Sequence, residues 1–254
     1  MKVTFLGTGT SQGVPVIACS CAVCQSNDPR DKRLRTSIHI QHGNSSFVID
    51  SGPDFRQQML RAEIKNLTAL IFTHEHKDHV AGMDDIRAFN YVLKKKIDIY
   101  ATLRVQEALV REFPYVFHDF KYPGVPEVNM ITIDEHPFII EGLEFIPIEV
   151  LHYKLPVNAY RFGDFTYITD ANFISEKEKE KIKGSRIVVI NALRREKHVS
   201  HFNLQEALEL IKELQPEKAY LTHISHQLGK HSDVEQELPP NVFLAYDGFE
   251  IEMS

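Results

Sequence analysis

Residues 73–79 read Thr-His-Glu-His-Lys-Asp-His and directly follow the apolar run Leu67 to Phe72. A strand gains nothing from three imidazoles and a carboxylate at its end, whereas a divalent metal ion needs imidazole nitrogens and carboxylate oxygens that converge on one point. The alternative is a polar loop that is rich in histidine by chance, but such loops are normally built from Gly, Ser, Asn and Asp. The stretch therefore predicts a metal site at the end of a buried strand.

The spacing within this stretch predicts two metal positions. His74 and His76 are two residues apart on an extended segment, so their side chains point to the same side and can bind one ion. Asp78 and His79, at the turn into the next helix, are directed at a second ion. Two ions about 3.5 to 4 Å apart usually share a hydroxide and bind both the attacking and the leaving oxygen of a phosphate ester. Such a site needs further ligands.

Three later residues each follow a predicted strand. His152 follows the run 143–151, Asp170 follows residues 165–169, and His223 follows residues 219–222. Binding residues concentrate where strands emerge into loops, so these three transitions support one another as ligand candidates. Each residue alone could also be a structural one with its hydrogen bonds satisfied.

The combination of His-x-His-x-Asp-His with a later His, Asp and His resembles the metallo-β-lactamase superfamily over nearly the whole chain. The fold that this resemblance implies is α/β, a four-layer αβ/βα sandwich with a dinuclear site along one edge. Residues 5–10 (Phe-Leu-Gly-Thr-Gly-Thr) and 198–204 (His-Val-Ser-His-Phe-Asn-Leu) resemble the phosphodiesterase branch, which includes transfer-RNA 3′ processing nucleases.

Three further segments resemble, more narrowly, the phosphodiesterases of the bacterial carbon–phosphorus lyase pathway, which hydrolyse a ribosyl cyclic phosphate. They are residues 19–24, 221–227 and 246–251. The resemblance implies that one ion is held by His74, His76 and His152, and the other by Asp78, His79 and His223, with Asp170 as the bridging ligand. Asp78 and Asp170 then belong to the catalytic centre as well as to the metal site.

The segment before residue 204 holds a candidate proton donor. The apolar residues of 204–214 recur with helical spacing, so a helix is predicted to begin just after His201. A departing alkoxide is a strong base, and an imidazole that is not a ligand suits it as a proton donor. The resemblance gives this catalytic role to His201, and an ordinary loop or capping residue is the alternative.

The three cysteines, Cys19, Cys21 and Cys24, predict a second metal site. Their odd number and close spacing give no disulfide framework, so the chain is expected to keep reduced thiols in the cytoplasm. Three thiolates need a fourth ligand for a closed structural zinc site, and the resemblance implies His226. The alternative is three unligated small residues in a turn.

Other charged residues are candidates for supporting roles. Asp50 follows a short strand and could accept the N–H of a ligating histidine, or it could cap the turn at residues 52–53. A further group of cations close to the candidate site could contact substrate phosphate or simply be solvated. This group comprises Lys154, Arg194, Arg195 and Lys197.

Composition predicts a single domain over residues 1–254. The chain is 43% hydrophobic and 25% charged, without a Pro- or Gly-rich linker, and no stretch approaches the ~18 apolar residues of a membrane span. Short strands are expected near residues 3–6, 37–40, 47–49 and 68–72, followed by a helix over residues 83–92.

The expected function is that of a dinuclear metal-dependent hydrolase. It would hydrolyse a small phosphodiester, with a cyclic ribosyl or nucleotide ester as one form, through a metal-bridged hydroxide, using two divalent ions (manganese or zinc) beside one structural zinc. A net charge of −6 disfavours binding of long nucleic acids, whose binding proteins usually present a basic surface. Transfer-RNA nucleases that share this motif carry an arm inserted between the third His and the bridging Asp, and the seventeen residues between His152 and Asp170 leave no room for one. A transfer-RNA 3′ nuclease and a catalytically silent metal-binding scaffold are the alternatives. A homodimer is a state that the sequence leaves open.

Overall fold

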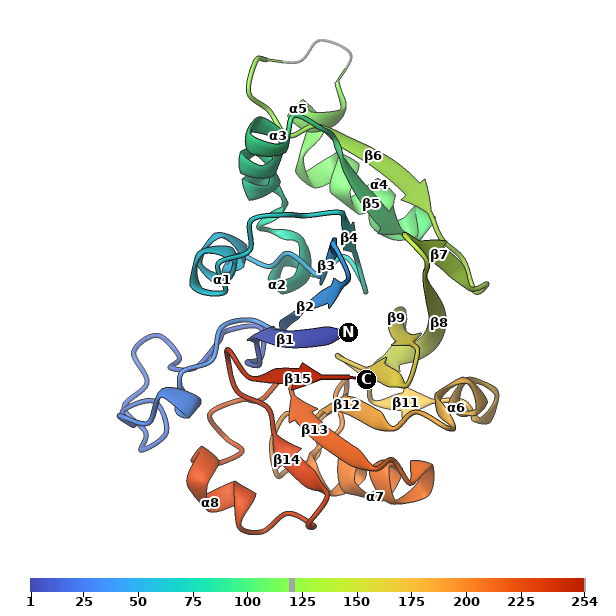
Figure 1. Ribbon diagram of the computed structural model, residues 1–254. Coiled ribbons are helices and arrows are strands. Elements are labelled where there is room, and N and C mark those ends of the chain that lie inside the picture. Colours follow the sequence, from blue (N-terminus) through green and yellow to red (C-terminus); the bar gives the residue numbers. More distant parts are fainter. Residues whose placement is uncertain (119–121, 254) are drawn as a thin grey trace. The chain divides into compact units, whose positions relative to one another are not determined.

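The computed structural model describes residues 1–118 and 122–253, and the chain divides into two units (Figure 1). Unit 1 comprises Met1–Gly7, Ser37–Asp134 and Gly248–Ser254, and unit 2 comprises Thr8–Thr36 and Glu135–Asp247. Each unit contains one β-sheet with its own helices. The expectation of one domain over residues 1–254 stays a prediction.

The sheet of unit 1 has seven strands in the order β15-β1-β2-β3-β4-β5-β6. Strands β15, β1, β2 and β3 pair antiparallel, and β3 to β6 pair parallel. Parallel neighbours require crossover connections, and helices supply these between β3 and β6. The strands are β1 (Lys2–Gly7), β2 (Ser37–His42), β3 (Ser45–Ile49), β4 (Ala69–Ile71), β5 (Ile97–Ala101), β6 (Val128–Thr132) and β15 (Glu250–Glu252).

Helices of unit 1 cover an apolar core on this sheet. Val48 and Leu70 from the sheet and Phe55 and Leu109 from helices belong to one buried cluster. The four strands expected from the sequence are confirmed, and the expected helix over 83–92 is a 3₁₀ turn followed by α3. The helical segments are α1 (Phe55–Arg61), α2 (Lys77–Val80), η2 (Met83–Ile86), α3 (Arg87–Leu93), α4 (Leu103–Glu112) and α5 (Pro114–Phe117).

The sheet of unit 2 has the order β11-β8-β9-β10-β12-β13-β14, and β7 pairs with β8 outside this path. Strands β8 and β9 form an antiparallel hairpin, whereas β10, β12, β13 and β14 run parallel. The strands are β7 (Phe138–Ile140), β8 (Leu143–His152), β9 (Leu155–Phe162), β10 (Phe165–Tyr167), β11 (Phe173–Ile174), β12 (Ile187–Asn191), β13 (Lys218–Thr222) and β14 (Val242–Leu244).

The parallel strands of unit 2 set the place of its functional residues. Because β10, β12 and β13 run in the same direction, the residues that follow them emerge at the same edge of the sheet. Asp170 follows β10, Asn191 ends β12, and His223 follows β13. The topology therefore gathers residues that are far apart in the sequence.

Helix α7 (Leu204–Leu214) begins at a capping box just after His201. The Asn203 side chain accepts from the Glu206 backbone N–H at 2.8 Å, and the Glu206 carboxylate accepts from the Asn203 N–H at 3.0 Å. This reciprocal cap, worth about 1 kcal/mol, fixes where the loop ends and the helix begins. The other helices of unit 2 are η1 (Pro29–Asp31), α6 (Glu176–Ile182) and α8 (His231–Glu235).

Helix lengths bear on the membrane prediction. Helix α7 has 11 residues and packs its apolar face, including Ala207 and Ile211, into the core of unit 2. Within residues 1–118 and 122–253, no helix has the length and apolar character that a bilayer crossing requires.

Candidate metal centres

The histidine-rich loop of unit 1 gathers its four predicted ligands. His74 lies between β4 and α2 and is buried, and its ring centroid lies 4.7 Å from that of His76 and 4.1 Å from that of His79. Asp78 and His79 are in the single turn of α2, with His79 Nε2 3.4 Å from Asp78 Oδ2. The local spacing in the sequence therefore does bring imidazoles and a carboxylate together.

Asp50 orients the histidines of this loop. Its fully buried carboxylate accepts from His79 Nδ1 at 2.7 Å and from the Thr73 hydroxyl and backbone N–H at 2.8 and 2.9 Å. Because the Thr73 hydroxyl donates to Asp50, it can accept from His74 Nδ1, which is 3.0 Å away. Both imidazoles then carry their proton on Nδ1, and their Nε2 lone pairs suit a metal ion. This is the orienting contact that the sequence interpretation gave to Asp50.

Burial and hydrogen bonds act in opposite directions on Asp50. Burial raises the pKa of the Asp50 carboxyl above its ordinary value, while His79 and Thr73 lower it. The buried carboxylate is costly unless it is fully paired, and three donors satisfy its two oxygens.

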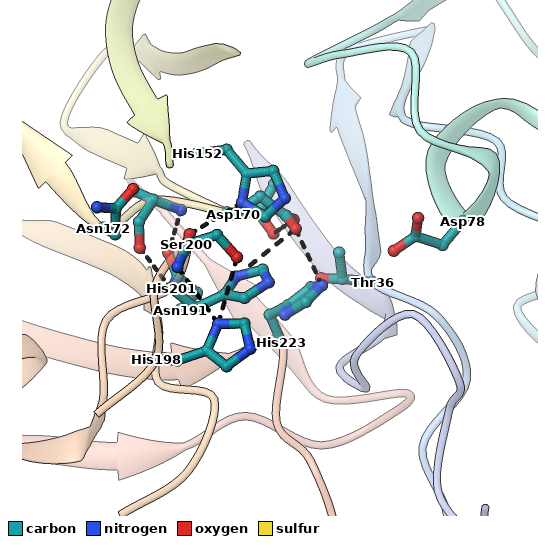
Figure 2. Close-up of polar contacts among 12 residues, drawn as sticks. Thr36, Asp78, His152, Asp170, Asn172, Asn191, His198, Ser200, His201 and His223 are labelled. Atoms are coloured by element: carbon teal, nitrogen blue, oxygen red, sulfur yellow. Dashed lines mark hydrogen bonds and ion pairs between the residues drawn. The ribbon is translucent and has the colours of Figure 1, made fainter. Parts of the chain in front are cut away.

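The predicted ligands of unit 2 also meet, although they come from separate segments. Figure 2 shows the side chains of His152, Asp170, His201 and His223 turned toward one another. Asp170 Oδ1 lies 3.2 Å from His223 Nε2 and 3.7 Å from His201 Nδ1. One donor atom each of His152, Asp170 and His201 lies within 4.8 Å of the others. A carboxylate surrounded by three imidazoles is a donor set that fits a divalent cation.

The backbone at two of these strand ends is strained. Asp170 has φ 55° and His223 has φ 53°, in the left-handed region that non-glycine residues rarely adopt. Asn191 braces the first of these turns, since its side chain accepts from the Ala171 N–H at 2.8 Å and donates to the Ala171 carbonyl at 2.9 Å. Such strain persists where the surrounding structure holds it, often at functional sites.

The loop before α7 orients His152. His152 Nδ1 donates to the Ser200 carbonyl at 2.9 Å, so the lone pair of this imidazole is on Nε2, the atom that would coordinate an ion (Figure 2). His198 Nδ1 in turn accepts from the Ser200 backbone N–H and lies 3.2 Å from its hydroxyl. A main-chain carbonyl thus orients a histidine here, where unit 1 uses a carboxylate.

His201 is placed beside Asp170, but its surroundings favour the neutral imidazole. Burial, followed by His223, lowers the pKa of His201 to about 2, and Asp170 opposes this. A proton donor works best with a pKa near the working pH, so burial works against the predicted role. Its buried Nδ1 has no hydrogen-bond partner among the described residues, which suits a site that receives an additional polar group or ion.

The three cysteines and His226 form a separate cluster within unit 2. The Sγ atoms of Cys19, Cys21 and Cys24 lie 3.3, 3.3 and 3.5 Å from His226 Nδ1. Donors around a tetrahedral zinc with bonds of about 2.0 to 2.3 Å lie about 3.6 Å apart, so the cluster fits such an ion. The Cys24 N–H and His226 lower the pKa of the Cys21 thiol to about 6, whereas burial raises that of Cys24 to about 11.

This cluster lies beside the strand end that carries His223. The Ile224 N–H donates to the Thr8 carbonyl at 2.9 Å, and the Thr10 N–H donates to the Ile224 carbonyl at 3.1 Å. The N-terminal loop of unit 2 is therefore tied to the segment between His223 and His226.

The cations proposed for substrate phosphate are mostly engaged elsewhere. Arg195 makes two bonds with the Glu237 carboxylate at 2.8 and 2.9 Å, and Arg194 donates to Gln227 and to the Lys197 carbonyl. These contacts favour structural roles for the two arginines. Lys154 lies beside an aromatic ring, with its Nζ 5.4 Å from the centroid of Tyr153.

Two supporting residues were missed by sequence reasoning. Asn191 braces the Asp170 turn, and Ser200 orients His152 through its carbonyl. Asn191 ends a strand beside β10 and β13, and that position was a usable signal. The carbonyl of Ser200 has no signal in the sequence, because every residue carries one.

Comparisons with known proteins show what this chain is similar to. A family model described as "Beta-lactamase superfamily domain" matches residues 45–224. Among solved structures, this chain is similar to a new diphosphatase from the PhnP family, with 36% sequence identity and a TM-score of 0.93. The match covers 100% of this chain and 98% of that one.

This chain also matches two curated relatives, in each case over about half of the relative's length. An octanoyltransferase of Porphyromonas gingivalis is 37% identical over 253 residues, which are 98% of this chain and 51% of that protein. A ribonuclease Z of Methanococcus maripaludis is 26% identical over 168 residues, which are 64% of this chain and 48% of that protein. The chain thus spans about half the length of these two curated relatives.

Proposed function

Because the chain belongs to the family described as "Beta-lactamase superfamily domain", we propose that it is a metal-dependent phosphodiesterase. Its substrate is a small phosphodiester, and the leading substrate class is a cyclic ribosyl or nucleotide ester. The predicted α/β fold of the metallo-β-lactamase type is confirmed by this membership and by the TM-score of 0.93. The observation that carries the proposal is the gathering of Asp170 with His152, His201 and His223 at one edge of the unit 2 sheet.

We propose two divalent ions, manganese or zinc, in the catalytic centre. As the family resemblance implies, their ligands would be His74, His76 and His152 for one ion and Asp78, His79 and His223 for the other, with Asp170 as a ligand shared by both. Within each unit the assigned residues lie together, with Nε2 lone pairs on His74, His79 and His152 by the hydrogen bonds described above. Mixed imidazole and carboxylate sets accept several divalent metals.

The side chains divide the work of hydrolysis. When bound, the ions neutralise phosphate charge and lower the pKa of coordinated water to about 7. Asp50 holds the unit 1 imidazoles in place, and the Ser200 carbonyl does the same for His152. Although burial favours its neutral form, His201 next to Asp170 is the group that we propose, as the family resemblance implies, to pass a proton to the departing oxygen.

We also propose one structural zinc at Cys19, Cys21, Cys24 and His226. The support is the set of sulfur-to-nitrogen distances of 3.3 to 3.5 Å, together with the ties between this loop and the strand end before His226. This ion would fix the loop rather than take part in the reaction.

A second candidate substrate class is a diphosphate linkage. The favouring observation is the 36% identity over the full chain with a diphosphatase of the PhnP family. A transfer-RNA nuclease has weaker support, because residues 153–169 consist of β9, β10 and their turns and hold no inserted arm. The net charge of −6 also disfavours long RNA.

An assay panel with the metal-loaded protein tests the proposal. The substrates are bis(p-nitrophenyl) phosphate, adenosine 2′,3′-cyclic phosphate, a dinucleoside diphosphate, precursor transfer RNA and a β-lactam, each with manganese, zinc or a chelator. We expect metal-dependent turnover of the two diesters, and little of the RNA or the lactam. Turnover of the diphosphate alone would assign the second candidate. No metal-dependent turnover would favour a silent metal-binding scaffold.

A further inference from the structure

The tip of the β8–β9 hairpin carries an exposed aromatic ring next to a proposed ligand. Tyr153 and Lys154 are the two residues between β8, which ends at His152, and β9, which begins at Leu155. The Tyr153 side chain is 57% exposed, although a tyrosine gains free energy mainly by burying its ring. Core packing therefore does not account for this residue.

The backbone of Tyr153 is held in an unfavourable conformation. Its φ is 60°, and two-residue hairpin turns with a positive φ at their first position favour glycine, asparagine or aspartate there. Asn172 fixes the conformation of the hairpin tip. Its side-chain carbonyl accepts a hydrogen bond from the Tyr153 backbone N–H at 2.6 Å, and its backbone N–H donates to the Leu151 carbonyl at 2.8 Å. A bulky residue kept at a strained tip, and tied to the loop after Asp170, points to function.

Two more exposed apolar side chains adjoin the same site segments. Phe173 is 51% exposed and pairs in the sheet with Leu151, and Val199 is 71% exposed and precedes Ser200, whose carbonyl binds His152. We call these three residues, each of which adjoins a site segment, the apolar rim (Tyr153, Phe173 and Val199). Exposed apolar side chains next to a polar site suit a ligand that has an apolar part.

Lys154 adds a positive charge to this rim. Its Nζ lies 5.4 Å from the centroid of the Tyr153 ring, within the range of a cation–π contact. An aromatic ring with a cation beside it suits a ligand that has both a flat ring and a negative charge. A nucleoside phosphate has both.

We propose that Tyr153 stacks on the base of a nucleoside phosphodiester whose phosphate is bound at the metal site, and that Phe173 and Val199 contact the same base. The inference rests on the proposed function and narrows its substrate class to esters that carry a nucleobase. Tyr153 is then a specificity residue, since it contacts the substrate away from the bond that is cleaved.

Paired substrates separate base recognition from phosphate chemistry. Adenosine 2′,3′-cyclic phosphate carries a base, and glycerol 1,2-cyclic phosphate has the same five-membered phosphodiester without one. In Tyr153→Gly we expect the KM for the adenosine ester to rise about tenfold, since base stacking is commonly worth a factor of this order, with kcat and the glycerol ester unchanged. Tyr153→Phe should retain the wild-type values.

Glycine is chosen for the substitution at residue 153 because this variant should fold as well as the wild type. Glycine relieves the positive φ of residue 153, so this variant should be at least as heat-stable as the wild type. Tyr91→Ala is the matched control, because Tyr91 is 76% exposed and has the Lys94 Nζ 4.1 Å from its ring centroid, which repeats the tyrosine and lysine pair in unit 1. This control should leave both substrates unaffected.

A binding measurement keeps the inference independent of turnover. Adenosine 5′-monophosphate and ribose 5-phosphate are titrated into the metal-loaded protein by calorimetry, and we expect the nucleotide to bind about tenfold tighter in the wild type and equally in Tyr153→Gly. If the wild type shows no turnover but prefers the nucleotide, and Tyr153→Gly loses that preference, the result would support base recognition by Tyr153 and overturn the proposed function. Turnover of the adenosine ester with unchanged KM and binding in Tyr153→Gly would overturn the inference alone. A dimer that Tyr153→Gly dissociates, with unchanged nucleotide binding, would overturn it in favour of a second copy as the partner of the rim.

Discussion

The histidine loop of unit 1 and the strand-end residues of unit 2 assemble similar donors by different routes. In unit 1 the donors occupy one short peptide between β4 and α2, and the rings of His74 and His79 lie 4.1 Å apart. In unit 2 one donor ends β8, two others follow β10 and β13, and His201 precedes α7, so that only the sheet brings them together. Local spacing determines the first set, and topology determines the second.

The two sets also differ in how their histidines are oriented. The buried carboxylate of Asp50 serves His79 directly and His74 through Thr73. A main-chain carbonyl, that of Ser200, serves His152. Substitution can therefore remove the support of unit 1 in one step, whereas the support of unit 2 depends on the loop conformation between β12 and α7.

The largest effect is expected at Asp170. We predict that Asp170→Ala abolishes turnover and releases both catalytic ions, because its carboxylate lies against His223 and His201 and is assigned to both ions. Metal content after desalting and the rate with bis(p-nitrophenyl) phosphate check this. Asp164→Ala, at an exposed turn of unit 2, is the matched control. Full metal content in Asp170→Ala would show that the unit 2 set holds no shared ligand.

Replacing His201 tests whether one imidazole of unit 2 acts on the substrate rather than on a metal. His201→Ala should keep the ions but slow turnover by about 10²- to 10⁴-fold, mostly for esters with poor leaving groups. The measurement is kcat for a series of leaving groups, together with metal content. Equal losses for good and poor leaving groups would count against proton donation, and a lost ion would make His201 a ligand.

In unit 1 the orienting carboxylate gives a smaller, graded effect. Asp50→Asn should weaken metal binding about 10- to 100-fold, since the amide is a poorer acceptor for His79 Nδ1 and Thr73. Competition with a chelator dye measures the dissociation constant. Asp98→Asn, on β5 of the same sheet, provides the comparison. An unchanged constant would mean that this loop needs no orienting carboxylate.

The sequence revealed the two routes to different degrees. The histidine loop was visible because its donors are neighbours, and the strands of unit 1 were visible as apolar runs. His152, Asp170 and His223 were visible as strand ends, but that they share one sheet edge came from the family resemblance, because spacing alone does not define strand order. Asn191, the Ser200 carbonyl and the strained Tyr153 tip depend on tertiary contacts and could not be predicted from spacing.

The cysteine cluster predicts an effect on stability with little effect on the reaction. Cys21→Ser should remove one zinc per chain and lower the melting temperature by about 5 °C, which corresponds to about 2 kcal/mol for a chain of this size. Metal analysis and a thermal melt measure these changes. Ser20→Ala, a neighbour outside the cluster, should change neither. The same zinc content in Cys21→Ser would remove the structural site while leaving the catalytic comparison intact.

The smallest effect concerns a buried histidine of unit 1 that is not a ligand. His39 Nε2 donates to the Ser46 hydroxyl at 2.8 Å, and burial, followed by Lys2, lowers its pKa from 6.5 to about 4. Because the folded pKa lies below the unfolded one, the unfolded chain binds the proton first as the pH falls. His39 therefore costs no stability above about pH 6.5, and its burial costs about 2 kcal/mol at pH 5 by linkage.

His39→Gln removes this titration while keeping a donor for Ser46. The free energy of unfolding, measured by denaturant melts between pH 7 and pH 4.5, should fall less steeply in the variant than in the wild type. His42→Gln, on the same strand, is the control. Because His39 belongs to neither ligand set, the difference between variant and wild type should be the same with metal and with chelator. If the difference in the pH dependence of unfolding disappears when the metal is chelated, the titration of His39 on β2 depends on the metal loop. His39 would then not be a purely structural histidine.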